Sequence, residues 1–202
     1  MPRLTPESLP EIQQAIGEAG LDGWLLYDFR ASNPIAREFL GMADAHLSRR
    51  IFVLIPRSGV PLAITHNSEQ GAWRDWPAAW RRERYSSWRE LEGYLQAMVG
   101  GKRLAMEYSP GDAVPYLDRI PAGMLELIRE AGATVSTSGE LVSRFYATWT
   151  PDNLAAHIRS AEHLHRIVHE AFAHAGAMAR AGTPIAEHAL QAHVLRLARC
   201  LH

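Results

Sequence analysis

A polar loop that contains an acid, a guanidinium and an amide follows the first apolar run of the sequence. The loop spans residues 27–33 and includes Asp28, Arg30 and Asn33. In α/β sheets, ligand sites tend to form at the carboxyl ends of strands, so these three side chains are candidate substrate-binding residues. A structural alternative is an Asp28–Arg30 ion pair, with an Asx turn at Asn33 before Pro34. Both interpretations stay open at the level of sequence.

The histidines are unevenly distributed, and eight of the ten lie at or after His157. The segment from His169 to His174 is similar to the zinc motif His-Glu-x-x-His but has one residue too many. Histidines five residues apart on a regular helix lie about 140° from each other, so they cannot bind one ion. His165 and His169 have the favourable i, i+4 spacing, but His165 falls within an apolar stripe. We therefore expect no metal site in this chain.

The remaining chemical signals are isolated. Cys200 and His202 are a lone pair near the end of the sequence, and we give them no catalytic role. Glu107 is a single acid at the end of an expected strand, and an acid without a partner is more often structural. The sequence contains no Gly-x-Ser-x-Gly elbow and no phosphate-binding loop. We therefore predict no catalytic residue.

The composition is that of an ordinary globular protein without a nucleic-acid or membrane partner. Apolar residues make up 47% and charged residues 21%, and the net charge is −1. The basic stretch at residues 81–84 contains an acid and is interpreted as a solvated face. No apolar run of the secretory kind follows the start, and the strongest run, residues 51–55, is too short to span a bilayer. The single cysteine points to a reducing compartment, so we expect a soluble cytoplasmic protein.

The elements that must position the polar loop alternate between strand and helix patterns. Strands are expected at residues 23–27, 50–55, 61–65, 103–107 and 134–136. Helices are expected at residues 5–19, 35–40, 67–80, 88–99, 124–131 and 140–145. The turn at residues 56–59 joins the second and third strands as a hairpin, so the sheet is expected to be mixed. The predicted fold class is α/β, a three-layer sandwich of a mixed sheet covered by helices.

The pattern changes after residue 147, and no strand signal follows. The sequence Thr-Pro-Asp at residues 150–152 is a helix start, with a hydroxyl cap, a proline and an acid in the first turn. Apolar residues then recur at steps of three and four until residue 181, and Gly182 is expected to end the helix.

A second helix is expected after the Thr-Pro pair at residues 183–184. No glycine, proline or polar tail stops this helix before His202, so we expect the chain to be truncated. The predicted organisation is an α/β domain at residues 1–147 and a helical arm at residues 148–202.

Five segments carry a family resemblance in their order and spacing. They are Leu-Asp-Gly-Trp-Leu-Leu at 21–26, Arg-Ile-Phe-Val-Leu-Ile-Pro at 50–56, Lys-Arg-Leu-Ala-Met-Glu at 102–107, Gly-Glu-Leu-Val-Ser-Arg-Phe at 139–145 and Ala-Gly-Thr-Pro-Ile-Ala-Glu at 181–187. Together they resemble the creatinase, aminopeptidase P and prolidase family over the whole chain. The resemblance implies that residues 1–147 are a creatinase/prolidase N-terminal-like domain. It also implies that residues 148–202 are the first helices of a pita-bread catalytic domain.

The resemblance implies a function for a full-length parent protein. Family members usually hold two divalent metals, Mn, Co or Zn, through two aspartates, a histidine and two glutamates that lie further along the sequence. A metal-bound hydroxide then attacks the bond before proline in a dipeptide or peptide. The amino-terminal domain is expected to form a wall of the active site and an interface of a homodimer, with Arg30 gripping the substrate carboxylate. This chain alone is expected to be inactive.

Two alternatives stay open. Many family members begin the long helix with a lysine and a glutamate-rich segment, whereas residues 148–153 here read Thr-Trp-Thr-Pro-Asp-Asn. The parent could therefore be a pita-bread relative without peptidase activity, such as a creatinase-like hydrolase or a binding module. The chain could also be a stand-alone α/β interaction domain. The sequence beyond residue 202 distinguishes these alternatives, through the presence or loss of the metal ligands.

Overall fold

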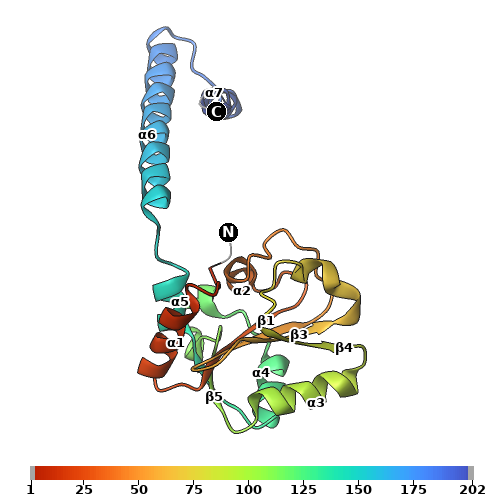
Figure 1. Ribbon diagram of the computed structural model, residues 1–202. Helices are drawn as coiled ribbons and strands as arrows, with labels where there is room; N and C mark the ends of the chain where they lie inside the picture. The colour runs from red at the N-terminus through yellow and green to blue at the C-terminus, as the bar shows by residue number, and fades with distance from the viewer. Residues whose placement is uncertain (1–2, 200–202) are drawn as a thin grey trace. The chain divides into compact units, whose positions relative to one another are not determined.

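A six-stranded mixed sheet forms the centre of the α/β part (Figure 1). The computed structural model describes residues 3–199, so Cys200, Leu201 and His202 lie outside the described residues. The strands are β1 (Gly23–Asp28), β2 (Ile51–Pro56), β3 (Leu62–His66), β4 (Arg81–Tyr85), β5 (Arg103–Met106) and β6 (Thr134–Thr137). Their order in the sheet is β4-β3-β2-β1-β5-β6. β2 is antiparallel to both β1 and β3, while the pairs β3–β4, β1–β5 and β5–β6 are parallel.

Helices cover both faces of this sheet. One core cluster draws on α1 (Leu9–Glu18), α2 (Pro34–Phe39), the 3₁₀ helix η1 (Asn67–Trp73) and α5 (Gly139–Phe145). The other cluster draws on α3 (Trp88–Val99) and α4 (Ala122–Glu130). Alternate residues of β1 divide between them, with Trp24 in the first cluster and Leu25 in the second. The predicted three-layer sandwich with a mixed sheet is confirmed.

The central strands and α3 form where the sequence predicts them. All six residues of β1 are buried because helices cover it on both faces, which explains its unbroken apolar run. The β2–β3 hairpin is also present as predicted. α3 begins with a capping box, in which the Ser87 hydroxyl accepts a hydrogen bond from the Glu90 N–H at 3.3 Å. The Glu90 carboxylate in turn accepts one from the Ser87 N–H at 3.0 Å.

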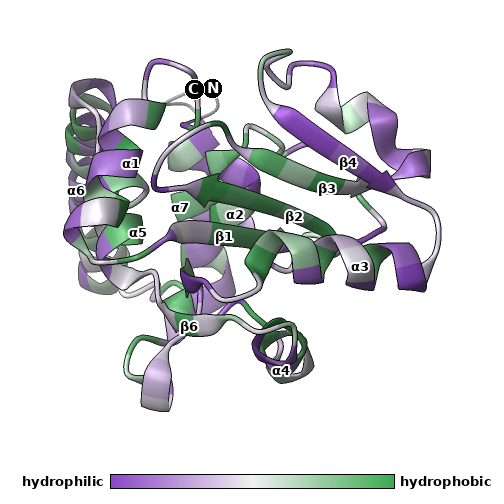
Figure 2. Ribbon diagram, turned by 60° about the horizontal axis from the view of Figure 1, so that its bottom comes forward, coloured by the Kyte–Doolittle hydropathy of each residue, from purple (hydrophilic) through white to green (hydrophobic). Residues whose placement is uncertain are grey.

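Residues 81–84 are not simply a solvated face, because they form most of β4, an edge strand. β4 pairs with β3 in parallel, and Tyr85 is its one buried residue. Figure 2 shows β4 as the strongly hydrophilic strand beside the apolar β2 and β3. An edge strand hydrogen-bonds on one side only, and charged side chains there oppose pairing with another chain. Because these residues are charged, the sequence lacks the alternation of apolar and polar residues by which strands are predicted, and β4 was not expected.

The prediction of a helix over residues 67–80 is wrong in its second half. Only Asn67–Trp73 is helical, as the 3₁₀ helix η1, and Pro77 lies in the turn that follows. The spacing of Trp73, Trp76 and Trp80 reflects stacking, because their rings meet edge to face at centroid distances of 5.2 and 4.9 Å. α1 likewise starts at Leu9 and not at residue 5, after a turn closed by hydrogen bonds between Thr5 and Ser8.

Residues 149–202 form a second compact unit, separate from the unit at residues 1–148. Its described part consists of α6 (Pro151–Arg180) and α7 (Glu187–Arg199). The predicted start of α6 is confirmed, since the Thr150 hydroxyl accepts a hydrogen bond from the Asn153 N–H at 3.2 Å. Its predicted end is confirmed as well, with Gly182 at a φ of 75°. α7 begins later than predicted, at Glu187.

One stripe of α6 is apolar and exposed. Leu154, Ile158, Val168 and Phe172 follow one another at helical spacing and are 49% to 76% exposed. None of the helices within residues 3–199 has the combination of length and apolarity that a membrane crossing requires.

We predict that residues 1–148 fold without the second unit. Both core clusters consist only of residues from this unit, so removal of residues 149–202 takes nothing from either core. Circular dichroism of the 1–148 fragment should show a cooperative thermal transition within about 5 °C of the one in the whole chain. A broad transition without cooperativity would contradict this prediction. The fragment 149–202, whose apolar side chains are largely exposed, is expected to lack a cooperative transition.

Candidate functional site

The carboxyl ends of three parallel strands meet at one edge of the sheet and carry a buried polar network. Asp28 is the last residue of β1, Glu107 follows β5, and Ser138 follows β6. All three residues are 0% to 1% exposed. Parallel strands bring their carboxyl ends to the same edge, which explains how residues so far apart in the sequence come together.

The Glu107 carboxylate is the centre of this network. It accepts hydrogen bonds from Trp24 Nε1 at 2.6 Å, Asn33 Nδ2 at 2.8 Å and Ser138 Oγ at 3.1 Å. Burial raises the pKa of Glu107, and the three donors act in the opposite direction because they favour the ionised form. A carboxylate that is enclosed in this way serves structure and has no free oxygen to offer a substrate.

Asp28 and Asn33, two of the three predicted substrate-binding residues, belong to the same network. The Asp28 carboxylate accepts hydrogen bonds from the backbone N–H of Asn33 at 2.9 Å and of Ala31 at 3.3 Å. Asn33 donates to the Tyr27 carbonyl at 2.9 Å as well as to Glu107, and its side-chain oxygen accepts from the Ala36 N–H, which caps α2. Both side chains are 0% exposed, so they support the loop from within.

The structural alternative, an ion pair between Asp28 and Arg30, is wrong, because Asp28 has another partner. Asp28 pairs instead with Arg37 of α2, at 3.4 Å between Oδ2 and Nη1. Arg37 is itself buried, and its guanidinium also donates to the carbonyls of Ala43 and Ala45. The buried cation therefore comes from the helix that follows the loop.

Arg30 is the exposed member of the predicted trio, at the tip of a strained loop. Arg30 and Ala31 have φ angles of 53° and 63°, so two successive residues that are not glycine adopt the left-handed conformation. Each such residue costs about 1–2 kcal/mol, and the loop persists because the Asp28 carboxylate holds the Ala31 and Asn33 amides. Within residues 3–199, no ion pair involves Arg30. The exposed Arg30 residue therefore stands in a loop whose backbone is fixed by buried hydrogen bonds.

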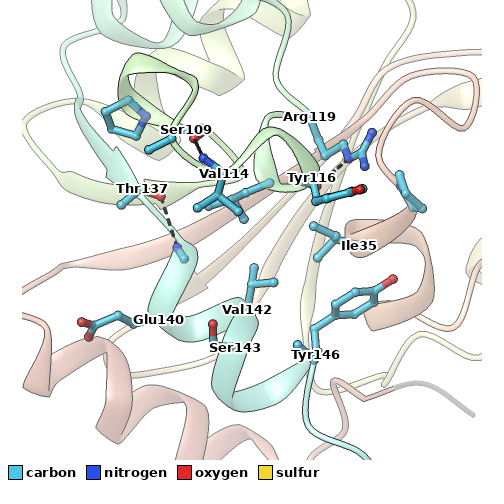
Figure 3. Close-up of a pocket in the computed structure, with 16 residues that line it drawn as sticks. Ile35, Ser109, Val114, Tyr116, Arg119, Thr137, Glu140, Val142, Ser143 and Tyr146 are labelled. Carbon is cyan, nitrogen blue, oxygen red and sulfur yellow. Dashed lines mark hydrogen bonds between the residues drawn. The ribbon is translucent and has the colours of Figure 1, made fainter.

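An apolar cavity of about 670 Å³ lies beside this network (Figure 3). Its walls come from α2, from α5 and from the loop after β5, which includes η2 (Pro110–Asp112) and η3 (Pro115–Leu117). Ile35, Val142 and Tyr146 line it together with Val114 and Tyr116. Apolar walls of this kind fit a binding role, and the polar groups at the wall include hydroxyls, the Arg119 guanidinium and the Glu140 carboxylate.

Sequence reasoning missed this cavity, although one signal was present. Val114 and Tyr116 are apolar residues in a proline-containing loop with no helix or strand period, and they are 52% and 81% exposed. The loop is fixed by the Ser109 hydroxyl, which accepts a hydrogen bond from the Val114 N–H at 2.9 Å. Arg119 Nε also donates to the Tyr116 carbonyl at 2.9 Å.

The histidines of the second unit approach each other in pairs. The rings of His165 and His169 lie 4.3 Å apart on α6, and those of His174 and His193 stack at 4.2 Å between α6 and α7. Among the described residues, 3–199, no group of three or more histidine, cysteine, aspartate or glutamate side chains could hold a metal ion. The described residues therefore offer no ligand set for the two metals, whose ligands the family resemblance assigns to sequence further along.

We predict that Glu107→Gln destabilises the protein by about 1–3 kcal/mol. Trp24 and Asn33 can only donate to this carboxylate, so either orientation of the new amide places a donor against a donor. Urea unfolding measures the loss of free energy. Glu92→Gln on the exposed side of α3 is the matched control and should change the stability by less than about 0.5 kcal/mol. Equal effects of the two substitutions would contradict a structural role for Glu107.

The difference in unfolding free energy between the wild type and Glu107→Gln should depend on pH in a defined direction. Because the folded pKa of Glu107 is raised, its contribution to stability is complete below the ordinary value of 4.5 and is lost as the pH rises through the folded pKa. The wild-type free energy of unfolding minus that of Glu107→Gln should therefore decrease from about pH 5 to about pH 8. A difference that grows over this range would show that the three donors outweigh burial.

Comparison with solved structures relates this fold to known proteins. The chain is similar to a prolidase from Thermococcus sibiricus, with 14% identity, a TM-score of 0.57 and coverage of 81% of this chain and 42% of that one. It is also similar to dipeptidase PepE from Mycobacterium ulcerans, with 15% identity, a TM-score of 0.57 and coverage of 80% and 42%. For a prolidase from Pyrococcus horikoshii OT3 the identity is 14%, the TM-score 0.54 and the coverage 96% and 48%.

These similarities establish the fold. No family model and no curated protein matches the sequence. The chain spans less than half the length of the prolidase and dipeptidase structures that it matches. The chain therefore has the fold expected from its resemblance to the creatinase, aminopeptidase P and prolidase family.

Proposed function

We propose that this chain is the amino-terminal part of a Xaa-Pro metallopeptidase of the dipeptidase or aminopeptidase P type. The observation that supports it most is the fold shared with two prolidases and a dipeptidase, at TM-scores of 0.54 to 0.57. The coverage of only 42% to 48% of those chains supports an assignment to part of a longer enzyme.

The proposal divides the parent enzyme into a supporting and a catalytic part. Residues 1–147 are the amino-terminal domain, and residues 148–202 are the first helices of the catalytic domain. The described residues offer no cluster for a metal, so the two divalent ions, Mn, Co or Zn, are assigned to ligands outside this chain. When bound, such ions supply Lewis-acid and nucleophile-generating chemistry for hydrolysis.

The α/β domain contributes a wall of the active site and an interface of a homodimer. Arg30 is the residue assigned to the substrate, because it is exposed and stands on a loop fixed by Asp28 and Asn33. A guanidinium can hold the carboxylate of a proline-containing dipeptide with two parallel hydrogen bonds. Asp28 and Asn33 act through Arg30 as positioning residues.

We predict that the full-length parent hydrolyses Xaa-Pro dipeptides in the presence of manganese, cobalt or zinc. Turnover of Ala-Pro is compared with that of Ala-Ala, and a chelator should abolish it. The 202-residue chain alone is the control and is expected to be inactive. A folded full-length protein that cleaves neither dipeptide with any of the three metals would refute the proposed function.

We predict that Arg30→Ala in the full-length enzyme raises KM for dipeptides by about tenfold and shifts Tm by less than about 2 °C. Arg30→Lys should recover little, because a lysine lacks the planar fork. Arg57→Ala removes the same charge from an exposed position after β2, at the opposite edge of the sheet, and should leave KM unchanged. If Arg30→Ala and Arg57→Ala give the same KM, Arg30 does not contact the substrate.

A further inference from the structure

A second set of hollows lies at the same edge of the sheet, on the face covered by α3 and α4. Their residues come from the ends of four strands: Phe29 follows β1, Arg50 precedes β2, His66 ends β3 and Tyr85 ends β4. Trp88, the first residue of α3, completes the group. This edge is where α/β sheets form ligand sites, and the proposed peptidase function makes no use of these residues.

Two adjoining cavities share Phe29, Arg50 and Trp88 as a common wall. The smaller cavity is about 330 Å³ and the larger about 480 Å³. The Arg50 guanidinium carbon lies 5.4 Å from the Phe29 ring centroid and 5.0 Å from that of Trp88. Arg50 is thus held by cation–π contacts with two rings, and its position is fixed without an acid.

Positive charge is unbalanced in the smaller cavity. The described residues that line it include Arg49, Arg50 and His66 but no aspartate or glutamate. None of the ion pairs within residues 3–199 uses either arginine. Arg50 Nε is buried and has no hydrogen-bond partner in the described part of the chain. A buried donor without a partner is unfavourable, and a bound anion would satisfy it.

Two carboxylates of neighbouring segments accept hydrogen bonds from backbone N–H groups. Glu69 Oε1 accepts hydrogen bonds from the N–H groups of Ser48 and Arg49 at 2.6 and 2.8 Å, whereas Glu69 Oε2 is buried and has no hydrogen-bond partner among the described residues. Glu90 accepts from the Ser86 and Ser87 N–H groups at the start of α3. Neither forms an ion pair with Arg49 or Arg50, so both guanidiniums keep their capacity to bind an anion.

Neighbouring groups contact the backbone of Arg50 and the ring of His66. Burial raises the pKa of Tyr85 to about 12, so its hydroxyl stays protonated and donates to the Arg50 carbonyl at 2.9 Å. His66 Nδ1 accepts a hydrogen bond from the Ser68 N–H at 3.1 Å and lies 2.8 Å from the Ser68 hydroxyl oxygen. Arg50 is therefore held by its two ring contacts and His66 by Ser68, whereas the Arg49 side chain is exposed.

The two cavities differ in the charge that they favour. The larger one is lined by Glu126 and Glu130 in addition to Arg50, which disfavours an anion there. The indole of Trp88 is 46% exposed and offers a flat apolar surface beside the arginines. A volume of about 330 Å³ suits a small organic molecule.

We propose that Arg49, Arg50 and His66 bind the carboxylate or phosphate of a small ligand whose aromatic ring lies against Trp88. The guanidiniums supply directed donors for the anionic group, and the indole supplies stacking for the ring. This site adjoins the loop at residues 27–33, which contributes Phe29 to it, and the proposal does not depend on peptidase activity.

Isothermal titration of the whole chain tests the proposal with four probes. Benzoate and phenyl phosphate carry both an anion and a ring, inorganic phosphate carries the anion alone, and benzyl alcohol carries the ring alone. We expect one of the first two to bind with a Kd of about 1 mM or less, and the last two to bind at least about tenfold more weakly. Which of the first two binds more tightly identifies the anionic group. No binding of either, or equal binding of inorganic phosphate, overturns the proposal.

Matched variants identify the residues. Arg49→Ala and Arg50→Met should each weaken binding by about tenfold or more, and Trp88→Ala by about threefold or more, since each removes one directed contact. Arg89→Ala removes the same charge from the next position on α3, which does not line the cavity, and should leave Kd unchanged. Circular dichroism verifies folding, and the exposed Arg49 provides the test if Arg50→Met is unstable. Equal losses in Arg49→Ala and Arg89→Ala would mean that only overall charge matters.

Discussion

The buried carboxylate of Glu107 is the interaction on which the functional edge of the sheet depends. Its three donors, on Trp24, Asn33 and Ser138, are separated from it by 83, 74 and 31 positions in the sequence. An acid that is removed from water is strongly unfavourable unless donors surround it. The network is therefore complete only when β1, β5, the start of α2 and the start of α5 are all in place. One side chain thus couples the assembly of the sheet edge to the loops that it carries.

The strained loop is a consequence of this network. Asn33 connects Glu107 to the cap of α2, and its backbone N–H connects to Asp28. Asp28 then fixes the Ala31 amide, and Arg37 offsets its charge. Two left-handed residues in succession, Arg30 and Ala31, would relax if these bonds were absent. The backbone that carries the exposed Arg30 side chain is therefore fixed by buried polar residues that bond to one another and to nearby main-chain groups.

The local sequence could predict most elements but not the site, for a physical reason. Apolar runs identify β1 and β2 because both faces of the sheet are covered, and the capping residues define α3 within one turn. β4 was not predicted, because the charged residues that protect an edge strand from pairing leave no alternation of apolar and polar residues in its sequence. Asp28 and Asn33 lie in one hydrogen-bonded group, but their burial and the pairing of Asp28 with Arg37 depend on contacts with α2 and β5. Their role in substrate binding stays a prediction. Contacts between residues far apart in the sequence cannot be predicted from the spacing of nearby residues.

The polar residues at this edge of the sheet fall into two groups, those that the stability of the fold requires and those that it does not. Asp28, Asn33, Arg37 and Glu107 are buried and mutually satisfied, so the fold alone explains their presence. Arg30, Arg49 and Arg50 have no acid partner within residues 3–199, and Arg50 leaves a buried donor unused. Structures at 14% to 15% identity share the fold, and fold does not determine function. The positive charges that folding does not require are therefore the residues from which function must be argued, and all three lie at one edge of the sheet.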